Sequence, residues 1–193
     1  MKILWNDFET GGTDPLIHSP LSFAMIATDG DQVIGEWYTE IRELPLVLTP
    51  QALAINKIDI HKDGISFNLF REEYFNKIRT WFYKGQKPSK ENMPFYGGHN
   101  TAFDRPILKR IVCSPNSSFD GCYYHHIDTM SMAVPLNAAG VIKVSDYKLE
   151  TLAKYFDIVP KEDLHNALTD VRLTMKIYQE MKNLLRTKEW ITK

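Results

Sequence analysis

The chain opens with three short strand-like runs, and the turn residues Asp29-Gly30-Asp31 stand between the second and the third. Residues 2–8 form an apolar run that ends in polar residues, which is typical of a buried strand. Residues 20–28 and 33–41 are rich in strand-forming residues. An Asp-Gly step between two such runs indicates a β-hairpin. The start of the chain therefore predicts a sheet with antiparallel neighbours.

After the hairpin, predicted helices alternate with predicted strands. Residues 49–57 predict a short helix, and Ser66 can cap a second one whose apolar side chains recur three and four residues apart. The other expected elements are strands at 94–98 and 123–127, a helix at 102–112, and helical apolar stripes that start at Leu149 and Leu164. Strands joined through helices favour parallel pairing. We therefore predict an α/β fold, a mixed β-sheet flanked by α-helices, as one domain over residues 1–193.

Composition indicates a folded protein and argues against one that coats nucleic acid. Of the 193 residues, 44% are hydrophobic and 24% are charged, and the formal net charge of −1 differs from that of proteins that coat nucleic acid. Contact with a polyanion would therefore be local or mediated by metal ions. Cys113 and Cys122 form no zinc or disulfide pattern, so we expect free thiols in a reducing compartment. We find no signal peptide and no apolar run of about 20 residues, and we expect a cytoplasmic protein without membrane contact.

Acidic residues stand where predicted strands end or predicted helices begin. Asp7 and Glu9 close the first strand, and alternation along a strand places them on the same face. Such a pair repels itself unless cations neutralise it. Asp104 opens the helix at 102–112, where an acid can also simply stabilise the helix terminus. Asp-x-Glu and a lone Asp are common by chance, so neither segment is informative alone.

A third acidic segment, His165-x-Ala167-x-x-Asp170, precedes the last predicted helix and is much rarer by chance. With it, the chain offers four carboxylates and one histidine. Oxygen ligands suit Mg²⁺ or Mn²⁺ rather than zinc. Acid-rich sites of this kind typically hold two divalent ions about 3.5–4 Å apart that clamp a phosphodiester. A histidine beside them could deprotonate the attacking water near neutral pH.

These segments occur in a fixed order that resembles the DEDDh 3′–5′ exonucleases over nearly the whole chain. The matching motifs are Asp7-Phe8-Glu9-Thr10-Gly11-Gly12, Asn100-x-x-Phe103-Asp104 and His165-x-Ala167-x-x-Asp170. Residues 49–58 are similar to the family's loop and helix over the substrate terminus. Asp128-Thr129 and residues 148–152 are similar to its scaffold segments. The resemblance implies a ribonuclease H-like fold and a single exonuclease domain.

The resemblance also implies roles for individual residues. Two divalent cations, Mg²⁺ or Mn²⁺, would be held by Asp7, Glu9, Asp104 and Asp170, with His165 as the general base. The substrate-binding residues would be Thr10, Gly11, Leu53, Asn56, Asn100 and Phe103. Among these, the backbone at Thr10 and Gly11 would hold the 3′-terminal sugar. Gly11 stands where the family commonly has Thr or Ser, and Asn56 where it often has His.

The implied activity is metal-dependent hydrolysis of phosphodiester bonds at DNA 3′ ends, which releases nucleoside 5′-monophosphates. The expected substrate is a single-stranded or frayed DNA 3′ end, because stacking on bases requires that they be unpaired. Two alternatives remain open: an exoribonuclease acting on RNA, and a noncatalytic module that binds nucleic acid or a DNA polymerase. The full set of acids weighs against the module. Proofreading and DNA repair are both open as roles.

Several other polar residues stay outside the expected site. Four histidines are expected on the surface or on strands: His18, His61, His125 and His126. His99 is expected to support the site, and Asp128 to cap a helix. The cationic residues Lys84, Lys87, Lys90, Lys109 and Arg110 could guide a phosphate backbone, but we expect them on a solvated loop and helix face.

Overall fold

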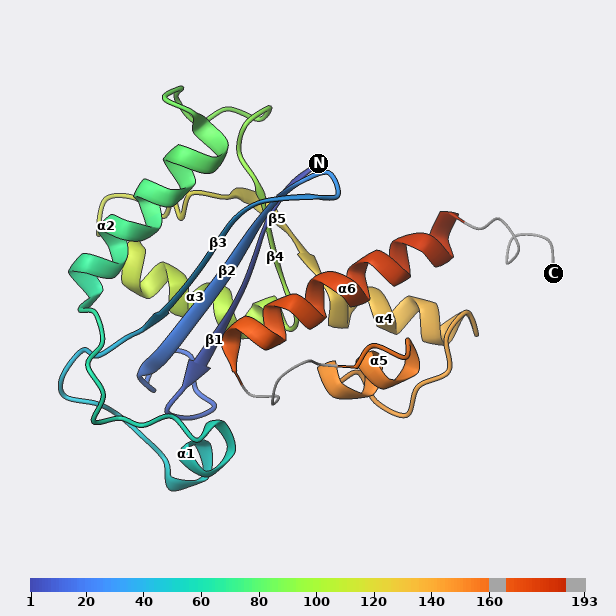
Figure 1. Cartoon of the computed structure of the whole chain (residues 1–193), viewed down its shortest axis with the longest axis horizontal. Coiled ribbons are helices and arrows are strands. Elements are labelled where there is room, and N and C mark those ends of the chain that lie inside the picture. The colour runs from blue at the N-terminus through green and yellow to red at the C-terminus, as the bar shows by residue number, and fades with distance from the viewer. Residues whose placement is uncertain (160–165, 187–193) are drawn as a thin grey trace.

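The computed structural model describes residues 1–159 and 166–186, and it shows a five-stranded mixed sheet with helices packed on both faces (Figure 1). The strands are β1 (Lys2–Thr10), β2 (Pro20–Asp29), β3 (Gln32–Glu40), β4 (Phe95–Gly98) and β5 (Tyr123–Asp128). Their order across the sheet is β3-β2-β1-β4-β5. The pairs β1–β2 and β2–β3 are antiparallel, whereas β1–β4 and β4–β5 are parallel. The predicted α/β fold with a mixed sheet is confirmed.

The helices begin largely where the sequence indicates. They are α1 (Pro50–Asn56), α2 (Phe67–Ile78), α3 (Thr101–Val112), α4 (Thr129–Ala138), α5 (Leu149–Tyr155) and α6 (Ala167–Arg186), and a π-helical segment, η1 (Arg79–Tyr83), extends α2. The side chains of Thr49 and Ser66 cap α1 and α2 by accepting backbone hydrogen bonds from Ala52 and Leu69. No helix in this described part of the chain is long and apolar enough to cross a membrane.

Alternation along β1 divides the core between the two faces of the sheet. Leu4 and Phe8 lie in an aromatic-rich core with side chains of α2 and α3. Ile3 and Trp5 point the other way and pack against the first turns of α6, which crosses the sheet in Figure 1. Asp7 and Glu9 continue the alternation of Ile3 and Trp5, so they lie on the α6 face. The buried half of β1 thus fixes the direction in which its acids point.

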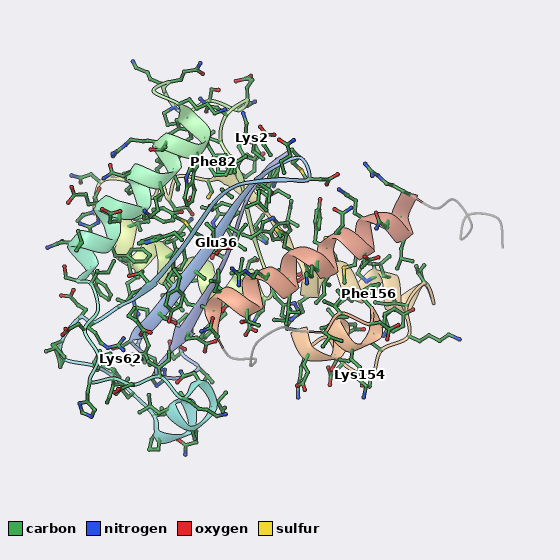
Figure 2. The ribbon with its side chains drawn as sticks, in the orientation of Figure 1. Lys2, Glu36, Lys62, Phe82, Lys154 and Phe156 are labelled. Carbon is green, nitrogen blue, oxygen red and sulfur yellow. The ribbon has the colours of Figure 1, made fainter. Side chains whose placement is uncertain are left out.

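A second group of apolar side chains joins α4, α5 and α6 beside the sheet. Ala133, Leu152 and Ile177 are members of this cluster, one from each helix. Figure 2 labels Lys154 and Phe156 at the end of α5, on the side of α6 away from α2. The long helix α6 therefore joins this cluster to the sheet.

Candidate metal centre

Three carboxylates meet at the end of β1. One oxygen each from Asp7, Glu9 and Asp170 lies within 4.8 Å of the others. Among residues 1–159 and 166–186, no other group of three Asp, Glu, His or Cys side chains converges in this way. Asp7 and Glu9 come from β1 and Asp170 from the first turn of α6. The structure therefore brings together three of the four predicted acids within reach of one ion.

The start of α6 is fixed over β1 by packing and by a cap. Ala167 and Val171 are buried in the same cluster as Ile3 and Trp5. The side chain of Asn166 accepts hydrogen bonds from the backbone N–H groups of Leu168 (3.1 Å) and Thr169 (3.4 Å). These contacts place Asp170 opposite the acids of β1.

Asp104 approaches the same strand from α3. It is only 3% exposed, and its Oδ1 accepts a hydrogen bond from the backbone N–H of Phe8 at 3.1 Å. Phe8 lies between Asp7 and Glu9 in the sequence, so Asp104 is anchored to the backbone that carries both acids. It is not part of the three-carboxylate group itself. The predicted fourth acid therefore adjoins the other three.

Burial and mutual repulsion perturb these carboxyl groups. Burial raises the pKa of Asp7 well above its ordinary value, and the charges of Asp104, Asp170 and Glu9 raise it further. Burial and the charge of Asp170 raise the pKa of Glu9 to about 8. Burial raises the pKa of Asp104 to about 8, although the N–H of Phe8 opposes this shift. Without a cation, the site therefore retains protons that isolated acids would lose.

The donor set fits a hard divalent cation. Within the described chain, no salt bridge joins Asp7, Glu9 or Asp104 to a Lys or Arg side chain. Buried acids without a cationic partner are costly unless a bound ion supplies the charge. Carboxylate oxygens are the ligands that Mg²⁺ and Mn²⁺ prefer. The composition of the centre thus suits a divalent cation.

Asp128 supports the site without joining it. Its carboxylate accepts hydrogen bonds from the backbone N–H groups of Asn100 (3.0 Å) and Thr101 (3.1 Å), which hold the loop at the start of α3. The same carboxylate caps α4 by accepting from Met130 at 2.9 Å, as predicted. His99 lies in that loop, and its Nδ1 is 2.9 Å from the hydroxyl of Thr129. The supporting role expected for His99 agrees with this contact.

The structure shows why Asn56 and Gly11 stand where they do. The Nδ2 of Asn56 donates to the carbonyl of Thr10 at 3.0 Å, and its Oδ1 accepts from the N–H of Ile58 at 3.1 Å. Asn56 therefore ties α1 to the end of β1. A Cβ atom on Gly11 would lie 2.5 Å from the carbonyl oxygen of Val47, so a larger residue has no room there.

The other predicted substrate residues lie on α1 and at the start of α3. Leu53 lies one turn before Asn56 on α1 and is partly exposed. Phe103 is partly buried at the edge of the aromatic core. Asn100 is exposed and has a left-handed backbone with φ of 64°. The predicted base His165 lies outside the described residues.

A polar pocket of about 280 Å³ opens beside Glu9, and most of its lining has no signal in the sequence. Asn56 and Asn166 are among its lining residues. Tyr38 on β3 and Lys62, labelled near α1 in Figure 2, border it farther away. The hydroxyl of Tyr38 donates to Oε1 of Glu40 at 2.7 Å. Tyr38 and Lys62 occupy ordinary strand and loop positions, so only the folded chain shows that they share a pocket with Glu9 and Asn56.

Comparison with solved structures places this fold beside bacterial exonuclease I. Exonuclease I from Methylocaldum szegediense matches with a TM-score of 0.78 and 20% identity over 98% of this chain and 41% of that chain. E. coli exonuclease I in complex with a dT13 oligonucleotide matches with a TM-score of 0.75 and 20% identity over 94% of this chain and 41% of that chain. The zinc-bound complex of the E. coli enzyme with single-stranded DNA gives 0.78 and 20% over 98% and 42%. This chain thus spans about two fifths of these structures and shares their ribonuclease H-like fold.

Comparison of the sequence assigns the family. Curated proteins give no sequence match. The model of the exonuclease family RNase_T matches residues 4–178, which include Asp7, Glu9, Asp104, His165 and Asp170. The match covers most of the chain, all three acidic motifs and the ribonuclease H-like sheet. The chain therefore belongs to the DEDDh-type 3′–5′ exonuclease family.

Proposed function

We propose that this chain is a divalent-metal-dependent 3′–5′ exonuclease that hydrolyses phosphodiester bonds at DNA 3′ ends and releases nucleoside 5′-monophosphates. The observation that carries the proposal is the convergence of Asp7, Glu9 and Asp170 within 4.8 Å. The family match over residues 4–178 supports it independently of the geometry. A binding module would have no need to hold three repelling acids together, and this argues against a noncatalytic role.

We propose that Asp7, Glu9 and Asp170, with Asp104 beside them, hold two Mg²⁺ or Mn²⁺ ions. When bound, such ions neutralise the carboxylates and polarise the phosphodiester. Asp104 would act partly by fixing the backbone at Phe8, since it accepts the N–H of that residue. His165 would take the proton from the attacking water. The cap that Asn166 provides to α6 supports this role, because it fixes the chain directly after the histidine.

The residues that follow Glu9 would position the terminal nucleotide. Thr10 and Gly11 would hold the 3′-terminal sugar, and Asn56 keeps α1 against them through its bond to the Thr10 carbonyl. Leu53 and Phe103 would contact the terminal base, and Asn100 would border its pocket. The mixed polar and apolar character of these side chains suits a base and its sugar.

DNA is favoured over RNA by the structural neighbours. The E. coli exonuclease I structures that match this fold hold dT13 or dA16 oligonucleotides. We therefore propose single-stranded or frayed DNA as the substrate class. An exoribonuclease would use the same five catalytic residues, so the comparison of DNA with RNA is the decisive one. We further propose that residues 1–193 act as one exonuclease domain in the cytoplasm, where free Cys113 and Cys122 would persist as thiols.

The test uses 5′-labelled DNA and RNA oligonucleotides of the same sequence, with Mg²⁺, with Mn²⁺ and with chelator. We expect a descending ladder from DNA with either metal, no ladder with chelator, and none on DNA that ends in a 3′-phosphate. Asp7→Asn is the inactive control.

Immediate release of the label as a mononucleotide would show the opposite polarity. Digestion of RNA alone would assign an exoribonuclease. Binding without digestion would leave the noncatalytic module, and co-purification with a DNA polymerase would then point to a proofreading complex.

A further inference from the structure

The loop between β1 and β2 follows the proposed metal ligands directly and is wound around Asp14. The carbonyl of Asp14 accepts the backbone N–H groups of Ile17 (3.3 Å) and His18 (3.0 Å). Its side-chain Oδ1 accepts the N–H of Leu16 at 2.9 Å. Such turns give the loop a definite shape from its own atoms. They do not fix where the loop lies relative to the metal centre.

The imidazole of His18 closes this loop onto the segment after Glu9. Its Nδ1 accepts the backbone N–H of Asp14 at 2.9 Å. The ring lies against Gly12: a Cβ atom placed there would be 2.5 Å from Cδ2 and Nε2 of the ring. Any displacement of His18 therefore alters the packing of Gly12, which is two residues beyond Thr10.

Arg110 of α3 holds the loop from outside. Its Nη2 donates to the carbonyl of His18 at 2.7 Å, across 92 residues of sequence. The guanidinium is partly buried, and burial lowers the pKa of Arg110 while the charge of Asp14 raises it. The same helix carries Asp104, which accepts the N–H of Phe8. Helix α3 thus holds β1 at Phe8 and the loop after β1 at His18.

We propose that Arg110 and His18 form a clamp that positions the β1–β2 loop for binding of the substrate's 3′ end. The inference rests on the proposed function, in which Thr10 and Gly11 hold the terminal sugar. The rest of that segment is already tied down: the N–H of Gly11 donates to Ser19 at 2.8 Å, and its carbonyl accepts from Thr49 at 2.6 Å. The carbonyl of Gly12 accepts the hydroxyl of Thr10 at 2.7 Å, and the His18 ring, held through its carbonyl by Arg110, packs against the other side of Gly12. They are positioning residues and touch no reacting atom.

A direct contact between Arg110 and a substrate phosphate is the competing explanation, and salt separates the two. A side chain that neutralises a phosphate makes the affinity more salt-dependent, and its loss reduces the slope of log KM against log salt by about 0.7 for single-stranded DNA. A clamp that acts through the loop leaves this slope unchanged. The two explanations therefore differ in the salt dependence of KM.

The test compares kcat and KM for a 5′-labelled single-stranded DNA at saturating Mg²⁺ and several salt concentrations. We expect Arg110→Gln to raise KM about tenfold and change kcat by no more than about twofold. Its salt slope and its Mg²⁺-induced rise in Tm should equal those of the wild type. Arg110→Lys, which keeps a charged donor on a long side chain where Gln is shorter and neutral, should restore part of the wild-type KM. Lys109→Gln is the matched control on the same helix and should behave as wild type.

Gly12→Ala provides a second test that leaves Arg110 intact, because its methyl group must displace the His18 ring. We expect the same rise in KM from this variant, so the proposal stays testable if Arg110→Gln fails to fold. A wild-type KM in either folded variant, or a reduced salt slope in Arg110→Gln, overturns the clamp. An inactive wild-type protein would instead refute the proposed function. An active wild type with insensitive variants would refute the clamp alone.

Discussion

Replacing Asp7 with Asn should leave the metal-free protein at least as stable as the wild type and remove most of its response to divalent cations. Asn has nearly the shape of Asp but no charge, so it removes repulsion without creating a cavity. Burial and the charges of Asp104, Asp170 and Glu9 all raise the pKa of Asp7, which shows that its ionised form is disfavoured in the folded, metal-free state. The surroundings of an ordinary structural acid would instead favour its ionised form and lower its pKa.

Glu9 sets the scale of the pH dependence of stability in the metal-free wild type. Its pKa rises from 4.5 to about 8 on folding, so the folded state holds the proton more tightly than the unfolded state. This contribution to stability is fully present below about pH 4.5 and is lost as the pH rises through about 8. At 1.36 kcal/mol per pKa unit the ceiling is about 4–5 kcal/mol. Partial exposure of Glu9 to water reduces it to on the order of 2 kcal/mol.

Urea unfolding at about pH 6 and about pH 8.5, with chelator or with Mg²⁺, measures these terms. The metal-free wild type should lose on the order of 1 kcal/mol between the two pH values, because they cover only part of the interval from 4.5 to about 8, and Asp7→Asn should lose less. Mg²⁺ at 100 times its Kd should add about 2.7 kcal/mol to the wild type and clearly less to Asp7→Asn. Asp63→Asn, an exposed acid on a loop, is the control and should match the wild type throughout.

Two results would refute this reasoning. If metal-free Asp7→Asn were less stable than Asp63→Asn by more than about 1 kcal/mol, Asp7 would be an ordinary structural acid. If Mg²⁺ stabilised Asp7→Asn and the wild type equally at matched ionic strength, Asp7 would not be a ligand.

Three further predictions concern other parts of the molecule. His165→Ala should lower kcat by about 10²–10⁴-fold with the Mg²⁺-induced rise in Tm retained; near-full activity at neutral pH would remove this histidine from the mechanism. Arg105→Leu should cost about 3–5 kcal/mol in urea unfolding, because it breaks the 2.8 Å ion pair with the buried carboxylate of Asp120, and a loss below about 1 kcal/mol would contradict this. Gly35→Ala should destabilise the fold by about 1–3 kcal/mol, because its Cβ would lie 2.2 Å from the Trp81 ring; an unchanged Tm would show that the ring can move away.

Elements defined by local signals could be predicted, and those defined by tertiary contacts could not. The hairpin and the cap at Ser66 depend on neighbouring residues, and the structure has both of them. Helix α4 was expected only as a helix capped by Asp128, because it is apolar on nearly every side and shows no period. The π-helical turn η1 was not expected. The π-helical turn buries the side chains of both Phe82 and Tyr83 in the core beneath the sheet, and this burial depends on tertiary contacts rather than on the local sequence.

In the site, too, features marked by local sequence signals could be predicted, and features that depend on distant contacts could not. The convergence of Asp7, Glu9 and Asp170 follows from a strand end and a helix start, which the sequence marks clearly. The bond from Asn56 to Thr10 joins residues 46 apart and had no local signal. Arg110 was expected on a solvated surface, and this was wrong, because its guanidinium is partly buried against the His18 carbonyl. A cationic side chain is predicted to be solvated when its partner is far away in the sequence, because the sequence alone does not reveal that partner.

The arrangement around β1 explains how the fold can hold a cluster of repelling acids. Trp5 and Phe8, on opposite faces of the strand, are almost fully buried, so β1 cannot shift to separate its carboxylates. Asp104 on α3 and Asp170 on α6 both reach this strand, because each helix packs against the sheet. The core therefore fixes the strand and the helices that carry the acids. Because the acids cannot move apart, their mutual repulsion contributes to the raised pKa values of Asp7 and Glu9. A divalent cation that binds there relieves this repulsion directly, which couples metal affinity to the stability of the whole sheet.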